Sequence, residues 1–261
     1  MKKKEEAKYL DREWLLMTAN LKAFFETEDQ EALHKFRVAV KKLRAMLYLF
    51  EIADDDGSLM KLFKPVRKIF KHAGVIRDAH INLLLAKQYK LKNDLFESSQ
   101  RQVIESGIID FRTNSEEYFK TLKDGHKKIK KQLNKLSDKD IAAYYRQQLE
   151  QIAANMDELQ FNEELHTSRK LIKILMYNKK LAEAALEGTV SLNISYLDKL
   201  QDTIGEWHDN IVTAELFAQP EFHDKVLVAK LKRANTTIRR NIATMAKDFL
   251  VKATTAETTA I

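Results

Sequence analysis

Residues 33–50 read LHKFRVAVKKLRAMLYLF and decide the fold, because their apolar side chains recur every three or four positions. The apolar positions are Leu33, Phe36, Val40, Leu43, Leu47 and Phe50. This spacing places them along one stripe of an α-helix that packs on a core. A second stripe follows the same steps and consists of His34, Arg37, Lys41, Arg44 and Tyr48. The stretch therefore predicts a helix with one apolar face and one basic face.

Residues 165–182 read LHTSRKLIKILMYNKKLA and repeat this pattern in the second half of the chain. The repeated basic stripe consists of His166, Arg169, Lys173, Tyr177 and Lys180. Downstream of each stripe, GVIRD at residues 74–78 corresponds to GEWHD at residues 205–209. A histidine, an arginine and a lysine repeated in register predict two copies of one anion-binding unit.

Most of the chain is expected to be helical, since it contains only 6 glycines and 2 prolines and its apolar residues recur at helical spacing. We predict an all-α fold of two related up-and-down bundles with about four helices each. The first bundle is expected over residues 1–125 and the second over residues 126–252. A frayed tail is expected at residues 253–261.

Breaks between helices are expected at the two glycine motifs. Gly74 and Gly205 each follow an amphipathic segment, which suits a left-handed residue just after a helix. Asp78 and Asp209 come shortly afterwards and suit the first, capping position of a new helix. Pro65 is expected to kink its helix or to begin it irregularly.

The positive charge is segregated along the sequence. The chain has 45 Lys and Arg against 38 Asp and Glu, a formal net charge of +7. Four stretches contain no acidic residue: 33–50, 59–77, 165–182 and 226–247. Solvated helix faces usually mix signs, because like charges one turn apart repel. These cations therefore indicate an anionic ligand.

The candidate anion contacts come from these stretches, since arginine binds phosphate oxygens through two hydrogen bonds and lysine acts as a point charge. The principal candidates are Arg37, Lys41, Arg44, Arg169 and Lys173, with His34 and His166 as hydrogen-bonding partners. The remaining candidates are Lys42, Lys64, Arg67, Lys68, Arg77, Lys170, Tyr177, His208, Arg233 and Arg240. Lysines 127, 128, 130 and 131 are left out, because they face all sides of a helix. Histidine protonation is expected to tighten binding on mild acidification.

Other features of the sequence bear on the location of the protein in the cell. The chain has no cysteine, so it can form neither a disulfide nor a thiolate metal site. Its first residues, MKKKEE, lack the apolar run of a secretion signal, and no stretch approaches the roughly 20 apolar residues of a membrane span. We expect a cytoplasmic protein without a membrane partner; the sequence leaves its oligomeric state open.

With these motifs in order, the chain resembles the CHAD domain, the conserved histidine α-helical domain, over nearly its full length. The first-half matches are His34, Arg37, Lys41, Lys42, Arg44, Gly74, Arg77 and Asp78. The second-half matches are His166, Arg169, Lys170, Lys173, Tyr177, Leu200, Gln201, Asp202, Gly205, His208 and Asp209. One departure is Met176, where the family often has arginine, so one cationic contact is expected to be missing.

The resemblance implies that both bundles form one CHAD domain, related by a pseudo-two-fold axis around a basic central cavity that binds inorganic polyphosphate. We expect a targeting role, such as association with polyphosphate granules, or a regulatory role, without catalysis, metal or cofactor. Some relatives are fused to a CYTH triphosphatase domain, but the sequence has no Glu-x-Glu-x-Lys strand motif. We therefore expect a stand-alone member.

Three other functions are compatible with the residues. Basic helices attract nucleic acid, although only Tyr48 and Tyr177 are suitably placed to stack bases. A metal-dependent phosphohydrolase would use His34, His166, His208 and Asp209, but the surrounding cations repel a metal ion. A helical scaffold with solvated basic faces would bind no specific ligand.

Overall fold

The computed structural model describes residues 3–53, 57–91, 93–220, 222 and 224–255, and the secondary structure in these ranges is helical without a strand. The all-α prediction is confirmed. The chain divides into two compact units, unit 1 over residues 1–136 and unit 2 over residues 137–261. The expected boundary after residue 125 falls instead inside a helix, where Gly125 faces the ring of Trp14.

Unit 1 contains five α-helices and one short 3-10 helix in its described residues. They are α1 (Lys3–Thr27), α2 (Gln30–Phe50), η1 (Glu51–Ala53), α3 (Ser58–Gln88), α4 (Asp94–Thr113) and α5 (Ser115–Gln132). Unit 2 contains α6 (Asp138–Asp157), α7 (Glu163–Leu186), α8 (Ile194–Phe217), α9 (Lys225–Ala246) and α10 (Phe249–Thr254).

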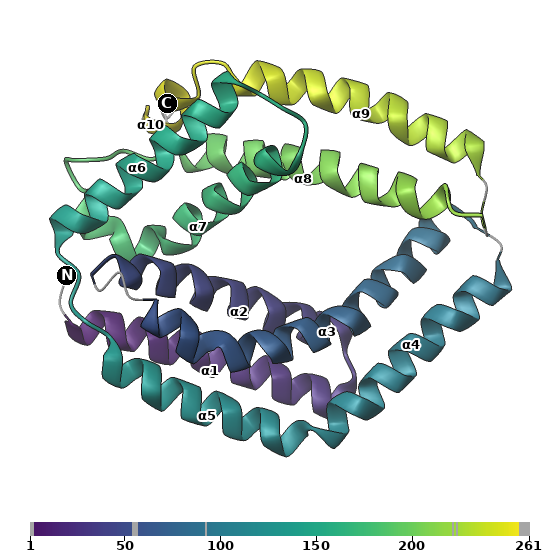
Figure 1. Cartoon of the computed structure of the whole chain (residues 1–261), viewed down its shortest axis with the longest axis horizontal. Coiled ribbons are helices and arrows are strands. Elements are labelled where there is room, and N and C mark those ends of the chain that lie inside the picture. Colours follow the sequence, from purple (N-terminus) through teal and green to yellow (C-terminus); the bar gives the residue numbers. More distant parts are fainter. Residues whose placement is uncertain (1–2, 54–56, 92, 221, 223, 256–261) are drawn as a thin grey trace, which may run out of the picture. The chain divides into compact units, whose positions relative to one another are not determined.

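Each unit packs its first four helices in chain order and then closes with a fifth (Figure 1). In unit 1, α5 returns to pack on α1 and α3, and in unit 2, α10 returns to pack on α6 and α8. The four successive helices are compatible with the prediction of about four per bundle, and one closing helix is added. Ala253 and Thr254 belong to α10, and Ala253 is buried, so these two residues are helical and not frayed. Residues 256–261 lie outside the described part of the chain.

Each helix that carries a basic stripe has a side-chain cap at its N-terminus. Asp29 accepts hydrogen bonds from the backbone N–H groups of Glu31 and Ala32 at the start of α2. Asn162 does the same for Glu164 at the start of α7. Caps of this kind typically stabilise a helix by about 1 kcal/mol. They fix where α2 and α7 begin and thus the orientation of the basic stripes that follow.

The two glycine motifs lie inside helices, which corrects the prediction of turns there. Helix α3 continues through Pro65, Gly74 and Asp78, and α8 continues through Gly205 and Asp209. The two described glycines with a left-handed backbone are Gly57 and Gly188, which lie in loops. Asp78 and Asp209 are exposed interior residues of helices, not caps. The reason for glycine at positions 74 and 205 lies on a neighbouring helix.

Candidate anion-binding faces

In unit 1, Arg37 of α2 lies directly against Gly74 of α3. The Nη1 atom of Arg37 donates a hydrogen bond of 2.9 Å to the carbonyl oxygen of Phe70. The guanidinium carbon lies 4.3 Å from the centroid of the Phe70 ring. A Cβ atom added to Gly74 would lie 2.6 Å from Nη1 of Arg37, closer than real contacts allow. Gly74 thus provides the space in which the guanidinium sits.

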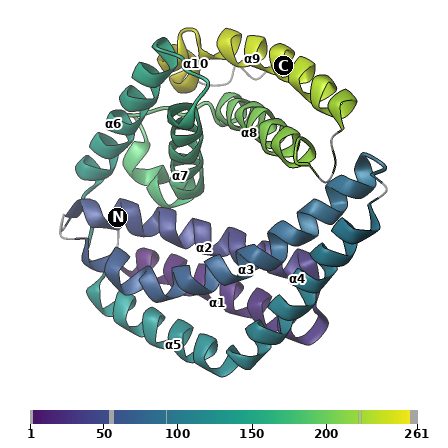
Figure 2. The same cartoon turned by 45° about the vertical axis from the view of Figure 1, so that its right-hand side comes forward.

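Unit 2 repeats this contact between α7 and α8, which lie side by side (Figure 2). The Nε atom of Arg169 donates a hydrogen bond of 2.9 Å to the carbonyl oxygen of Gln201. A Cβ atom on Gly205 would lie 2.6 Å from Nη2 of Arg169. In both units the accepting carbonyl lies one helical turn before the glycine. We call this arrangement the Arg–Gly contact.

The Arg–Gly contact fixes each guanidinium while leaving most of its donors unused. A guanidinium has five N–H donors, and each contact uses one hydrogen bond in the part of the chain that the structure describes. Both arginines are half-buried. Desolvation, followed by the charge of Arg77, lowers the pKa of Arg37, and Asp78 opposes this shift. The arginine remains a cation, and its remaining N–H groups can bind an oxyanion with little loss of side-chain freedom.

The cations around Arg37 form a surface that we call the unit-1 face. It consists of His34, Arg37, Lys41 and Arg77, whose charges act on one another, and of Arg67 and Lys71, which are assigned by helical spacing. Desolvation lowers the pKa of His34, and the charges of Arg77, Lys41 and Arg37 add to this shift against the opposing effect of Glu31. The Nε atom of Arg77 is buried and has no hydrogen-bond partner among the described residues. Arg67 and Lys71 belong by helical spacing to the side of α3 that carries Phe70 and Gly74.

The corresponding unit-2 face carries a pair of histidines. It consists of His166, Arg169, Lys173, Asp198, Asp202 and His208. The rings of His166 and His208 stack with their centroids 4.4 Å apart and their planes 22° apart. Desolvation lowers the pKa of His166, and the charges of Lys170, His208 and Arg169 add to the shift, while Glu163 opposes it. The predicted histidines of unit 2 are thus brought together.

Gln201 connects the remaining members of the unit-2 face. Its side-chain oxygen accepts a hydrogen bond of 3.2 Å from Lys173, whose ammonium lies 5.6 Å from the centroid of the Tyr177 ring. Desolvation and the charge of Arg169 lower the pKa of Lys173, whereas Asp202 and Asp198 raise it. Burial also raises the pKa of Tyr177 against the effect of Arg169. The cations of this face are close enough to influence one another.

Several of the predicted anion contacts belong to neither the unit-1 face nor the unit-2 face. Arg44 donates to the hydroxyl of Tyr48 at 2.6 Å and 3.2 Å, a contact within α2. Lys170 pairs with Glu163 at 3.0 Å, so its charge is partly balanced. The other residues have no hydrogen bond or ion pair that joins them to either face in the described ranges: Lys42, Lys64, Lys68, Arg233 and Arg240. Of these, Lys42 is half-buried and the rest are exposed.

Two acidic members of the unit-2 face were absent from the predicted site, although Asp202 was named in the family match. The side-chain amide of Gln201 donates to Asp198 at 2.9 Å and to Asp202 at 2.7 Å. Both aspartates lie between two of the acid-free stretches on which the prediction rested, 165–182 and 226–247. Lys71 was also absent from the candidates, although it lies in an acid-free stretch. Pairing residues 67–78 with residues 198–209 position by position would have identified all three.

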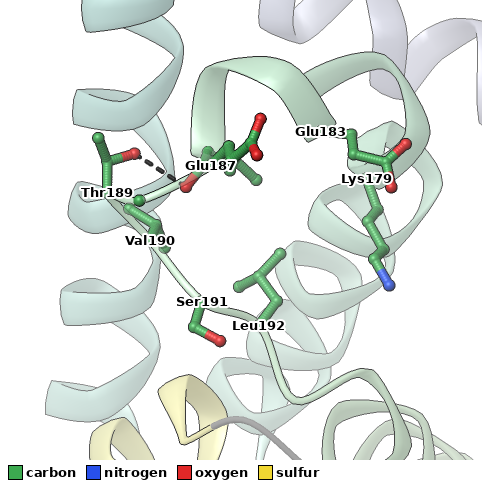
Figure 3. Close-up of a pocket in the computed structure, with 9 residues that line it drawn as sticks. Lys179, Glu183, Glu187, Thr189, Val190, Ser191 and Leu192 are labelled. Carbon is green, nitrogen blue, oxygen red and sulfur yellow. Dashed lines mark hydrogen bonds between the residues drawn. The ribbon is translucent and has the colours of Figure 1, made fainter.

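A hollow of about 720 Å³ lies elsewhere in unit 2, beside the connection between α7 and α8 (Figure 3). Two glutamates, Glu183 and Glu187, and one lysine, Lys179, line it, together with the segment 188–192. Thr189 donates its hydroxyl to the carbonyl oxygens of Ala185 and Leu186, which holds this segment against the end of α7. None of the candidate anion contacts lines the hollow, and its carboxylates disfavour an anion.

The geometry needed for the metal-dependent alternative is not assembled in the described residues. His208 Nδ1 lies 3.9 Å from Asp209 Oδ1. Within the described ranges, no three or more His, Asp or Glu side chains are placed to share a metal ion. None of the described helices combines the length and apolar character needed to cross a membrane.

Comparisons with known proteins bear on the family and the fold of the chain. A family model described as the CHAD domain matches residues 8–218. The crystal structure of the CHAD domain from the plant Ricinus communis superposes with a TM-score of 0.62 at 16% sequence identity. The superposition covers 95% of this chain and 90% of the plant chain. No curated protein matches the sequence.

Proposed function

This chain belongs to the CHAD family, and from that premise we propose that it binds inorganic polyphosphate in a targeting or regulatory role. The observation that carries the proposal is the Arg–Gly contact, which occurs once in each unit. A buried main-chain carbonyl and a glycine hold each guanidinium in place before a ligand arrives. Such preorganisation is useful for binding a flexible polyanion, because the protein then loses little entropy on binding.

The chemistry of the unit-1 face matches a chain of phosphates. Polyphosphate presents about one negative charge per repeat, and each repeat exposes oxygens that accept hydrogen bonds from guanidinium and ammonium groups. Arg37, Lys41 and Arg77 lie close enough to shift the pKa of His34, so their charges act on one small region. An anion placed there would relieve their mutual repulsion.

A binding role is favoured over a catalytic one, because arginine and lysine dominate the unit-1 face and provide charge without a nucleophile. Nucleic acid is the main competing ligand, since it also offers phosphates. The ring of Phe70 lies beneath Arg37, and burial raises the pKa of Tyr177. These aromatic side chains are engaged within the protein and are poorly placed to stack on bases.

The test is a calorimetric titration of the full chain with long-chain polyphosphate at low and physiological salt. Single-stranded and duplex nucleic acid of matched phosphate content serve as competing ligands. The variant Arg37→Gln with Arg169→Gln removes two charges, and Lys127→Gln with Lys131→Gln removes the same charge from exposed sites on α5. Circular dichroism and thermal melting establish that both double variants fold.

We expect polyphosphate affinity to exceed nucleic-acid affinity at physiological salt and to fall about 100-fold in the arginine variant, since hydrogen bonds to charged groups contribute roughly 1.5–3 kcal/mol each. The lysine variant should change affinity less than about threefold, as for solvated charges. Equal binding to all three polymers, lost with salt and indifferent to the arginines, would reject polyphosphate as the ligand.

A further inference from the structure

The Arg–Gly contact provides a reference by which α3 and α8 can be compared residue by residue. With Gly74 placed on Gly205, residues 67–78 read RKIFKHAGVIRD and residues 198–209 read DKLQDTIGEWHD. The carbonyl that holds the arginine belongs to Phe70 in one unit and to Gln201 in the other, which confirms the register. Three positions beside the contact then differ in charge.

These three positions carry cations in unit 1 but not in unit 2. Arg67 corresponds to Asp198, Lys71 to Asp202, and Arg77 to His208. Arg67, Lys71 and Arg77 carry 3 positive charges, whereas Asp198 and Asp202 carry 2 negative charges beside a histidine. The two units therefore place their corresponding arginines, Arg37 and Arg169, beside charges of opposite sign.

The aspartates of unit 2 are held within the face by hydrogen bonds. One side-chain amide, that of Gln201, donates to both Asp198 and Asp202, at 2.9 Å and 2.7 Å. The same residue accepts from Lys173 through its side chain and from Arg169 through its main chain. Gln201 is only 3% exposed, so this network has a buried centre. Its two carboxylates are thereby fixed near the cations that an anion would contact.

We infer that Asp198 and Asp202 act as built-in counter-charges that restrain anion binding at the unit-2 face and leave the unit-1 face as the stronger site. This inference rests on the proposed function and adds where the affinity resides. A phosphate at the unit-2 face meets two carboxylates whose charges already act on Lys173. A phosphate at the unit-1 face meets Asp78 and Glu31 as acidic neighbours and a larger group of cations.

The test exchanges the charges of corresponding positions and measures polyphosphate affinity of the full chain by calorimetry at physiological salt. Asp202→Lys places at α8 the residue that α3 carries at position 71. Glu215→Lys makes the same charge change at an exposed site on the same helix, about 20 Å farther along at 1.5 Å per residue. In the reverse direction, Lys71→Asp is compared with Lys87→Asp, two exposed positions of α3.

We expect Asp202→Lys to tighten binding about tenfold and Glu215→Lys to tighten it less than about threefold. Lys71→Asp should weaken binding at least about tenfold, and Lys87→Asp less than about threefold. If Asp202→Lys does not fold, Asp202→Asn with Glu215→Gln as its control should show the same direction with about a threefold gain.

The inference is overturned if Asp202→Lys and Glu215→Lys have equal effects, or if removing the aspartate charge weakens binding. The proposed function fails differently. In that case the unmodified protein binds polyphosphate no better than nucleic acid, and Lys71→Asp has no greater effect than Lys87→Asp.

Discussion

The α2–α3 pair of unit 1 and the α7–α8 pair of unit 2 hold an arginine against a glycine in the same way, yet they place different residues beside the histidine. His34 lies near the guanidinium of Arg77. His166 instead stacks on His208. The difference shows that the backbone arrangement of the Arg–Gly contact is independent of the charge around it. Position 77 or 208 can therefore adjust the electrostatics of a face without altering how the arginine is held.

Replacing one arginine at a time should produce the largest difference in polyphosphate affinity between variants of the two units. We expect Arg37→Gln to weaken polyphosphate binding about 30-fold and Arg169→Gln only about threefold, because the carboxylates of Asp198 and Asp202 lie beside the cations of the unit-2 face. Calorimetry measures both affinities, and thermal melting shows whether each variant folds. Equal losses from the two substitutions would mean that both faces contribute equally.

Replacing each glycine by alanine should affect polyphosphate affinity and the free energy of unfolding to different extents. In Gly74→Ala the new Cβ meets the flexible end of Arg37, at 2.6 Å from Nη1 and 3.5 Å from Cζ. In Gly205→Ala it meets Nη2 of Arg169 at 2.6 Å and also Cζ and Nε at 3.0 Å. Arg169 must therefore move farther than Arg37.

We expect Gly74→Ala to change the free energy of unfolding by less than about 1 kcal/mol, since the helix propensity gained by alanine offsets the weakened hydrogen bond. Gly205→Ala should cost about 1–2 kcal/mol. Gly74→Ala should lose about tenfold in polyphosphate affinity as the guanidinium leaves its position, and Gly205→Ala no more than about threefold. Denaturant unfolding and calorimetry provide the two measurements. Unchanged binding by Gly74→Ala would show that a fixed arginine is unnecessary.

The smallest effect concerns pH. The pKa of His166 is lowered below 6.5 by desolvation and then by Lys170 and His208, so this ring is mostly neutral at pH 7.5. A bound polyanion favours the charged form, which means that binding takes up protons and tightens as pH falls below about 6.5. We expect about a threefold gain between pH 7.5 and pH 6. The readout is calorimetric affinity across this range.

The variant His208→Arg tests whether the histidine pair produces this dependence. A permanent cation beside His166 lowers its pKa further, so the gain should move to lower pH. Arg77→His is the reciprocal variant, and it should make the response of the unit-1 face steeper. An unchanged pH profile in both variants would assign the dependence to other groups.

The same pKa shifts determine a stability trend for the unliganded protein. The pKa values of His34, His80 and His166 are all lowered in the folded state. The unfolded chain therefore binds more protons than the folded chain as pH falls below about 6.5. The free energy of unfolding is therefore higher above that pH and decreases on acidification. Bound polyphosphate should reduce this loss of stability.

The helices were predictable because periodicity is local information. The stripe from Leu33 to Phe50 requires no knowledge of other segments, and α2 ends at Phe50. The role of Gly74 was not predictable in this way. A glycine after an amphipathic segment is compatible with a helix end or with a close neighbour, and only the position of Arg37 distinguishes the two.

The sequence identified the principal candidate residues but not the balance of charge around them. Arg37, Arg169 and Lys173 were identified from the repeated stripe, and the structure places them on the faces described. Arg44 satisfies the same pattern but binds Tyr48 within its own helix. Asp198 was overlooked, because its effect on Lys173 arises between helices that the sequence reading treated separately.

The Arg–Gly contact also constrains how such a protein can change over generations. At positions 37 and 74, and again at 169 and 205, a side chain occupies the space that its partner leaves empty. A lineage that gains a methyl group at the glycine must shorten or redirect the arginine as well, so each pair should be inherited as a unit. Positions 71 and 202 are not under such a steric constraint. Descendants can exchange charge there one substitution at a time, and binding strength can drift while the paired positions stay fixed.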